Sequence, residues 1–232
     1  MSAILLVRHG QASFGAADYD QLSDLGQRQA TRLGESLAAR GCKVDVVMCG
    51  GMRRHRQTAE ACLGAMKREL PIATDAGWDE YDHDRLVAAF DPRFADRAAL
   101  GAELAASDEA AKTFQRIFAA ATARWVNGTH DADYAESYPE FGERVQAALT
   151  RLIERLERGH TALVFTSGGP ISAVAGRLLQ VPSPLQLALG WTLANGGVTK
   201  LISGRDGVKL STLNEHSHLE GPAEDAQLIT YR

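Results

Sequence analysis

Three consecutive residues near the start of the chain, Arg8-His9-Gly10, have the types that phosphoryl chemistry requires. An imidazole nitrogen can attack phosphorus, and a guanidinium offers paired N–H donors to phosphate oxygens. Glycine lets the backbone approach a bound group. A motif this short also arises by chance, and most lone histidines are structural. The catalytic interpretation therefore depends on other stretches of the chain.

Further polar motifs stand where loops or helices are expected to begin. Residues 22–30 (Leu-Ser-Asp-Leu-Gly-Gln-Arg-Gln-Ala) follow the first loop, and residues 54–59 (Arg-His-Arg-Gln-Thr-Ala) open a helix. Residues 167–169 (Ser-Gly-Gly) follow a late apolar run, and Glu80 lies in the acidic segment 78–83 (Trp-Asp-Glu-Tyr-Asp-His). The combination is far more specific than any one motif.

Taken in this order, the motifs resemble those of the histidine phosphatase superfamily, which includes cofactor-dependent phosphoglycerate mutase. The resemblance covers nearly the whole chain. It implies that His9 accepts the phosphoryl group, while Arg8 and Arg54 hold the phosphoryl oxygens. The register against the following Gln-Thr-Ala selects Arg54 over its neighbour Arg53.

The resemblance also implies that Glu80 protonates the departing oxygen. From the sequence alone, Asp79 and Asp82 are rivals for this role, and a solvated acidic loop without a catalytic role is the simplest alternative.

The chain departs from the family at the second catalytic histidine, because Ser167 stands at that position before Gly168-Gly169. A serine hydroxyl can donate to a phosphoryl oxygen, but without positive charge. The expected loss is about 1–2 kcal/mol, or roughly tenfold in rate. His160 would lie at the opposite end of its strand. One hypothesis is that His83 supplies the missing imidazole; the alternative is a loop histidine without a role.

Phosphate ligands after the first loop are also fewer than in mutases. In residues 11–15 (Gln-Ala-Ser-Phe-Gly), only Ser13 could bind phosphate, which weakens a mutase assignment. With Ser167, Gly168 and the helix start that follows, Ser13 completes the predicted phosphate site. Asn195 and the tail histidines His216 and His218 are interpreted as structural, and we expect no metal.

The elements that position these residues alternate between strand and helix. Apolar runs predict strands over 3–7, 44–49, 70–74 and 161–166, and a hairpin over 197–213. Helical spacing is found over 24–40, 54–67, 137–158 and 168–179. These patterns predict an α/β three-layer sandwich, with a mostly parallel central sheet and helices on both faces. Because ligands bind beyond the carboxyl ends of such strands, both glycine loops should share one rim.

We expect one domain over residues 1–232, with a helical insertion over about 84–136. The insertion carries Arg85, Arg93, Arg97 and Trp125, and we expect it to roof the pocket and select substrates. Sequence alone leaves the substrate open.

Composition limits the partners. The net charge of −4 and pI near 6.0 argue against nucleic-acid binding. The chain has three cysteines without metal-ligand spacing, and we find no signal peptide and no apolar run of membrane-spanning length. We therefore expect a cytoplasmic protein with a small phosphate ester as its partner, in which an exposed sheet edge could form a homodimer.

The leading prediction is a phosphoric monoester hydrolase that forms a phosphohistidine on His9, without metal or cofactor. The first alternative is a regulatory module that keeps Arg8 and Arg54 for phosphate but turns over slowly. The second is a phosphoglycerate mutase, which would need a bisphosphorylated cofactor to prime His9.

Overall fold

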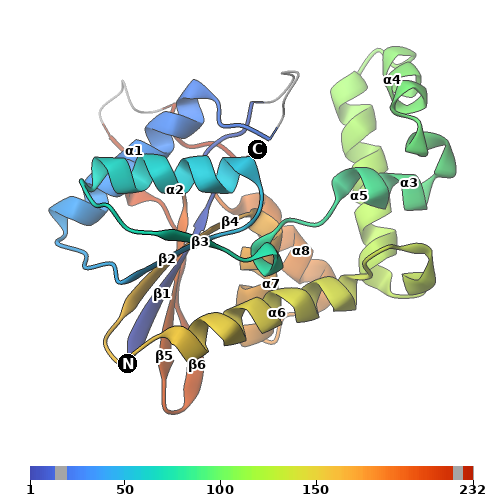
Figure 1. Ribbon diagram of the computed structural model, residues 1–232. Coiled ribbons are helices and arrows are strands. Elements are labelled where there is room, and N and C mark those ends of the chain that lie inside the picture. Colours follow the sequence, from blue (N-terminus) through green and yellow to red (C-terminus); the bar gives the residue numbers. More distant parts are fainter. Residues whose placement is uncertain (14–19, 222–226, 232) are drawn as a thin grey trace. The chain divides into compact units, whose positions relative to one another are not determined.

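The computed structural model describes residues 1–13, 20–221 and 227–231 (Figure 1). Within these ranges, a six-stranded sheet has the order β3-β2-β4-β1-β5-β6. The strands are β1 (Ser2–Arg8), β2 (Val46–Cys49), β3 (Ile72–Thr74), β4 (Thr161–Thr166), β5 (Val198–Gly204) and β6 (Gly207–Glu215). β5 pairs antiparallel with β1 and β6, and the remaining pairs are parallel. The predicted α/β fold with a mostly parallel sheet is confirmed.

Helices cover both faces of this sheet. The α-helices are α1 (Asp24–Ala39), α2 (Arg53–Ala65), α3 (His83–Phe90), α4 (Arg97–Ala105), α5 (Ala110–Asn127), α6 (Tyr138–Arg155), α7 (Gly168–Leu178) and α8 (Ser183–Thr192). Figure 1 shows α1 and α2 on one face of the sheet and α6 and α7 on the other. β1 and β4 are apolar and buried on both sides, as expected for central strands between two helical layers.

Three loops meet at one rim because their strands are parallel neighbours. The backbone N–H of His9, just after β1, donates to the Thr166 carbonyl at the end of β4 (2.8 Å). The N–H of Gly50, just after β2, donates to the Phe165 carbonyl (3.1 Å). The loops after β1, β2 and β4 therefore lie side by side, and the prediction that the first and last share a rim is confirmed.

Side chains fix the starts of two predicted helices. Ser23 caps α1, since its hydroxyl accepts from the Gly26 N–H (3.1 Å). Ser137 and Glu140 form a reciprocal capping box at α6: Ser137 N–H donates to the carboxylate (2.7 Å), and Glu140 N–H donates back to the hydroxyl (3.4 Å). Both helices begin where the sequence places them.

α8 has no counterpart among the helices expected from the sequence. Its apolar residues do not gather on one face, because Leu187 is buried while Leu185 and Trp191 are about half exposed. A proline near the first turn, Pro184, is the start signal that the sequence offers. α8 packs on α7 through small residues: a Cβ on Gly168 would lie 3.0 Å from the Gly190 carbonyl oxygen.

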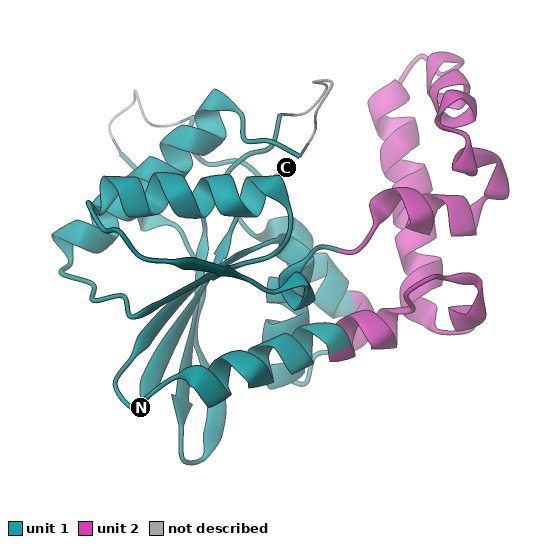
Figure 2. Ribbon diagram, viewed as in Figure 1, with its two compact units in different colours: residues 1–80, 144–181, 185–232 teal, residues 81–143, 182–184 magenta. Residues whose placement is uncertain are grey.

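The chain forms two compact units (Figure 2). Unit 1 comprises residues 1–80, 144–181 and 185–232, and unit 2 comprises 81–143 and 182–184. Unit 2 contains α3, α4 and α5, and these helices lie in the segment where we expect a helical insertion. Trp125 is buried in its aromatic core, with ring centroids 4.8 Å from Tyr81 and 5.0 Å from Tyr138.

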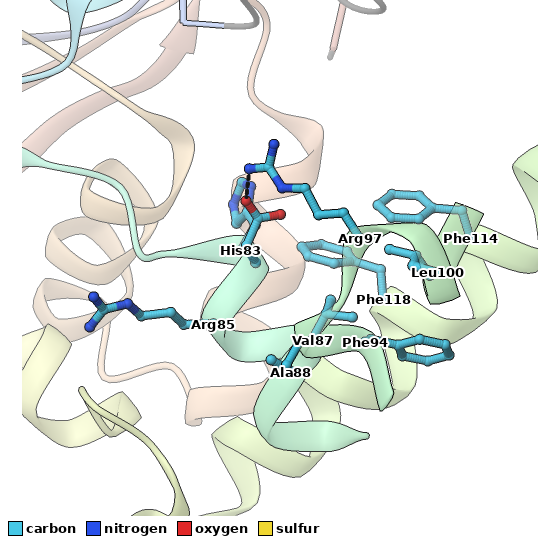
Figure 3. Close-up of a pocket in the computed structure, with 11 residues that line it drawn as sticks. His83, Arg85, Val87, Ala88, Phe94, Arg97, Leu100, Phe114 and Phe118 are labelled. Carbon is cyan, nitrogen blue, oxygen red and sulfur yellow. Dashed lines mark hydrogen bonds and ion pairs between the residues drawn. The ribbon is translucent and has the colours of Figure 1, made fainter. Parts of the chain in front are cut away.

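Unit 2 has a cavity of its own, shown in Figure 3. Phe94, Phe114 and Phe118 give it an apolar floor. Arg85 and Arg97 also line it, and Arg97 forms an ion pair with Asp84. Two of the arginines expected in the insertion thus contribute to the lining of a cavity within unit 2.

The cysteines are free thiols, and Cys49 and Cys62 are buried, as expected for small core side chains. Burial raises the pKa of the Cys62 thiol to about 12, which disfavours the reactive thiolate. Across the described ranges, we find no helix whose length and apolar character would let it cross a membrane.

Glycine permits the closest backbone approach beside the first loop. A Cβ on Gly26 in α1 would overlap the Gln11 carbonyl oxygen, and a Cβ on Gly10 would overlap the Gly26 carbonyl oxygen. We expect Gly26→Ala to destabilise the fold by about 1–3 kcal/mol, because backbone must move. The matched control is Gly64→Ala in α2, where a Cβ meets nothing within 4 Å and should stabilise by up to about 1 kcal/mol. Chemical denaturation measures the free energy of unfolding of both variants. Equal effects of the two substitutions would contradict the close backbone approach at Gly26.

Candidate active site

His9 lies at the carboxyl end of β1 with both ring nitrogens engaged. The side chain is 5% exposed. Its Nδ1 lies 2.7 Å from the Gly10 carbonyl oxygen, which can only accept, so Nδ1 carries the proton. Its Nε2 accepts a hydrogen bond from Arg54 Nε (3.2 Å). Nε2 is therefore the ring atom that can attack phosphorus, and its lone pair points at a guanidinium.

Electrostatics keep this imidazole neutral. Burial lowers the pKa of His9 well below its ordinary value of 6.5, and the nearby Arg54 and Arg8 charges lower it further. A neutral ring near pH 7 retains the nucleophilic lone pair that protonation would remove.

Arg54 is held by Asp20, a residue that no sequence motif singles out. The Asp20 carboxylate accepts from Arg54 Nη1 (2.7 Å) and from the Arg53 backbone N–H (2.8 Å). Asp20 thus caps α2, whose N-cap Met52 has no side-chain acceptor. The Asp20 carboxylate also offsets the positive charge of the basic residues in the first turn of α2, because positive charge is unfavourable at a helix N-terminus.

Arg8 is oriented from the other side of the site by backbone carbonyls. Its Nη1 donates to the Leu193 carbonyl, and its Nη2 lies 3.5 Å from the Tyr231 carbonyl oxygen. Of the two sequence-predicted arginines, Arg54 donates to His9 directly, whereas the charge of Arg8 contributes to lowering the pKa of His9. Arg53 donates to Asp20 through its backbone N–H.

Two buried side chains fix the backbone around His9. Thr58 accepts from the Gly10 N–H (3.1 Å) and donates to the Arg54 carbonyl (2.7 Å), so it joins the first loop to α2. Asn195 donates to the His9 carbonyl (3.1 Å), consistent with the structural role expected for it.

Glu80 meets the start of α7. Its Oε2 accepts from the Gly169 backbone N–H (3.0 Å), which places the carboxylate at the positive end of that helix. Its rivals have other roles: Asp79 accepts from the Gly51 N–H, and Asp82 caps α3 by accepting from the Arg85 N–H (3.0 Å).

His55 is a member of the site that the sequence motifs did not indicate. This fully buried residue in the first turn of α2 has its Nε2 2.7 Å from Ser167 Oγ. The ring centroids of His55 and His9 are 5.7 Å apart, with 36° between the planes. The imidazole therefore lies against Ser167, the residue that the sequence resemblance aligns with the second histidine.

Two further residues considered for the site have their own local contacts. Ser13 donates through its backbone N–H to the Gln21 carbonyl (2.8 Å), and among the described residues no hydrogen bond joins its side chain to His9 or Arg54. His83 opens α3 in unit 2, where its ring centroid is 5.3 Å from Phe118 and 4.6 Å from Tyr81.

Comparison with protein-family models gives a match to the histidine phosphatase superfamily, branch 1, over residues 4–88 and 85–216. The chain belongs to this superfamily. A comparison with curated protein sequences found no match.

Solved structures share the fold of this superfamily member. A phosphoglycerate mutase from Bacillus anthracis has a TM-score of 0.64 at 19% identity, with 94% of each chain covered. A mycobacterial glucosyl-3-phosphoglycerate phosphatase, in complex with inorganic phosphate, has 0.63 at 21% identity, covering 94% of this chain and 99% of that one. A phosphoserine phosphatase from Entamoeba histolytica, in complex with 3-phosphoglyceric acid, has 0.63 at 17% identity, covering 95% and 100%.

The superfamily motifs meet in unit 1 through one set of contacts. Arg54 contacts His9, His55 contacts Ser167, and two residues further Gly169 contacts Glu80. Gly168 lies between them, and a Cβ there would be 3.7 Å from Arg8 Nε. Ser13 is the predicted phosphate ligand that these described contacts do not include. Within the described ranges, no group of three or more His, Cys, Asp or Glu side chains could hold a metal ion.

Proposed function

We propose that this protein is a phosphoric monoester hydrolase that works through a phosphohistidine on His9. The observation that carries the proposal is the geometry of one atom. Because Nδ1–H is directed at the Gly10 carbonyl, His9 Nε2 is unprotonated, and its lone pair accepts a hydrogen bond from Arg54 Nε that must be given up when Nε2 attacks phosphorus. A buried neutral imidazole beside two arginines is suited to accept a phosphoryl group and to stabilise its oxygens.

The reaction has two steps. His9 Nε2 attacks phosphorus as the ester P–O bond breaks, and Glu80 gives a proton to the departing alkoxide. Water then attacks the phosphohistidine, giving up a proton to Glu80; the P–N bond breaks, its electron pair returns to Nε2, and inorganic phosphate leaves. Arg8 and Arg54 hold the phosphoryl oxygens in both steps, so the positive charge comes from side chains rather than from a metal.

Trapping the covalent adduct tests the proposal. The protein is mixed with a ³²P-labelled ester in the presence of a chelator, denatured in alkali, and assayed for bound label. A phosphohistidine survives alkali and is lost in acid, whereas a phosphoserine at Ser167 would survive acid. Phosphate release by protein that is unlabelled at every time point would contradict the mechanism, as would acid-stable label.

The solved structures suggest which esters to try. They include a phosphoserine phosphatase in complex with 3-phosphoglyceric acid and a glucosyl-3-phosphoglycerate phosphatase, whose named compounds are phosphate esters of small carboxylic acids or their conjugates. A panel of phosphoserine, 3-phosphoglycerate and simple alkyl and aryl phosphates would also separate the alternatives. Phosphate binding without turnover supports the regulatory module, and turnover of 3-phosphoglycerate only after priming by a bisphosphoglycerate supports the mutase.

A further inference from the structure

The pair formed by His55 and Ser167 has features that a structural contact alone does not require. Ser167 is the N-cap residue of α7, yet its hydroxyl makes no capping hydrogen bond. A serine at this position ordinarily accepts from an N–H of the first turn. Here the Gly169 N–H is taken by Glu80, and Ser167 Oγ lies 2.7 Å from His55 Nε2. The hydroxyl is thus held by the imidazole rather than by its own helix.

The second ring nitrogen of His55, Nδ1, also has unusual surroundings. This nitrogen is buried and, among the described residues, has no hydrogen-bond partner. A Cβ on Gly50 would collide with both this nitrogen and Asp79 Oδ1, so the bare Cα of glycine is what lets the ring and the carboxylate approach each other. A carboxylate near this edge of the ring favours a proton on Nδ1.

The ring is close to the reacting atoms. His55 follows Arg54 directly in α2, and its centroid is 5.7 Å from that of His9. Ser167 follows Thr166, whose carbonyl accepts from the His9 backbone N–H. Ser167 therefore begins the loop next to that of the nucleophile, where the superfamily resemblance places its second histidine.

We propose that His55 is a positioning residue that replaces the superfamily's second histidine from a different element, acting on the phosphoryl group through the Ser167 hydroxyl. Nε2–H of His55 donates to Ser167 Oγ, which leaves the hydroxyl proton to donate to a phosphoryl oxygen. Ser167 is then the group that touches the substrate, and His55 supplies the positive charge behind it. The inference rests on the proposed function, because it requires phosphoryl transfer to His9.

Charge balance is consistent with this arrangement. Before an ester binds, burial and the Arg54 charge lower the pKa of His55 well below its ordinary value, so the ring is neutral. A phosphoryl dianion beside Ser167 acts in the opposite direction and raises the pKa of His55. The ring takes up a proton from solvent as the ester binds and returns it when phosphate leaves; no other reactant is consumed.

The experiment measures kcat/KM for one phosphate ester in His55→Gln, Ser167→Ala and the double variant. Glutamine can keep a neutral N–H donor toward Ser167 but cannot carry charge. We expect each single variant to lose about tenfold or more, because charge-assisted hydrogen bonds are about twice as strong as neutral ones. The double variant should lose no more than the worse single variant, since the two residues act as one unit. The matched control, His160→Gln, alters a partly exposed imidazole at the other end of β4 and should leave kcat/KM unchanged.

Rescue separates a role in the reaction from a role in folding. Ser167→His in the background of His55→Ala moves the imidazole to the family position, and should recover most of the activity that His55→Ala loses. Wild-type activity in His55→Gln would overturn the inference, as would additive losses in the double variant. A rescue variant with a wild-type melting temperature but no recovered activity would also overturn it.

Failure of the inference about His55 can be distinguished from failure of the proposed function. If His9 of the wild-type protein is labelled but His55→Gln is unimpaired, only the role of His55 is wrong. If wild-type protein carries no label on His9 while it hydrolyses esters, the proposed function itself is wrong.

Discussion

His9→Ala should abolish both covalent labelling and ester hydrolysis. Removing an enzymatic nucleophile that forms a covalent intermediate costs on the order of 10⁴-fold or more in turnover, because the remaining groups can only stabilise direct attack by water. Alanine also removes the acceptor of the Arg54 Nε hydrogen bond, but it leaves Asp20 to hold the same guanidinium. The assay is initial-rate phosphate release together with alkaline trapping of label.

Binding should survive this substitution. Arg8 is held by the Leu193 carbonyl and Arg54 by Asp20, so both guanidinium groups keep their positions without the imidazole. Isothermal titration with inorganic phosphate should therefore give an affinity within about threefold of wild type, a change worth less than about 0.7 kcal/mol. His160→Ala serves as the control. Hydrolysis by His9→Ala at more than a tenth of the wild-type rate would disprove the nucleophile assignment.

The sequence predicts the fold well because its patterns are local. β1 and β4 are unbroken apolar runs, and Ser23 stands just before the helical spacing of α1. Parallel pairing of central strands then brings their carboxyl ends to one rim. Residue patterns alone are therefore enough to place the loops bearing His9 and Ser167 together.

The contacts that complete the site cannot be predicted in the same way. His55 looks like one of several basic residues at the start of α2, and only the fold brings it to Ser167. If Ser167 does stand in place of the second histidine, as the resemblance implies, the sequence can be searched for an imidazole from another element. The sequence offers His83 for that role, and within unit 2 the ring of His83 packs against Phe118 and Tyr81. Asp20 gives no signal in the sequence, because its partners Arg53 and Arg54 are more than 30 residues away and become neighbours only in the fold.

The second large effect is expected for Glu80→Gln, and its size should depend on the leaving group. Glutamine keeps an oxygen that can accept from the Gly169 N–H, so the start of α7 should be preserved. It cannot donate a carboxylic proton. For an alkyl phosphate, whose alkoxide leaves only with a proton, we expect kcat/KM to fall by about 10²–10⁴-fold. For 4-nitrophenyl phosphate, whose phenolate leaves unassisted, the fall should be about threefold or less.

A series of esters with graded leaving-group acidity measures this dependence directly. The slope of log kcat/KM against leaving-group pKa should be shallow in the wild type and steep in Glu80→Gln, because only the wild type neutralises the developing charge. Asp82→Asn is the matched control, since asparagine also caps helices and α3 should be retained. Its slope should equal that of the wild type. If kcat/KM falls equally for alkyl and aryl esters in Glu80→Gln, Glu80 is not the general acid. A steep slope in Asp82→Asn would indicate that Asp82 is the general acid instead.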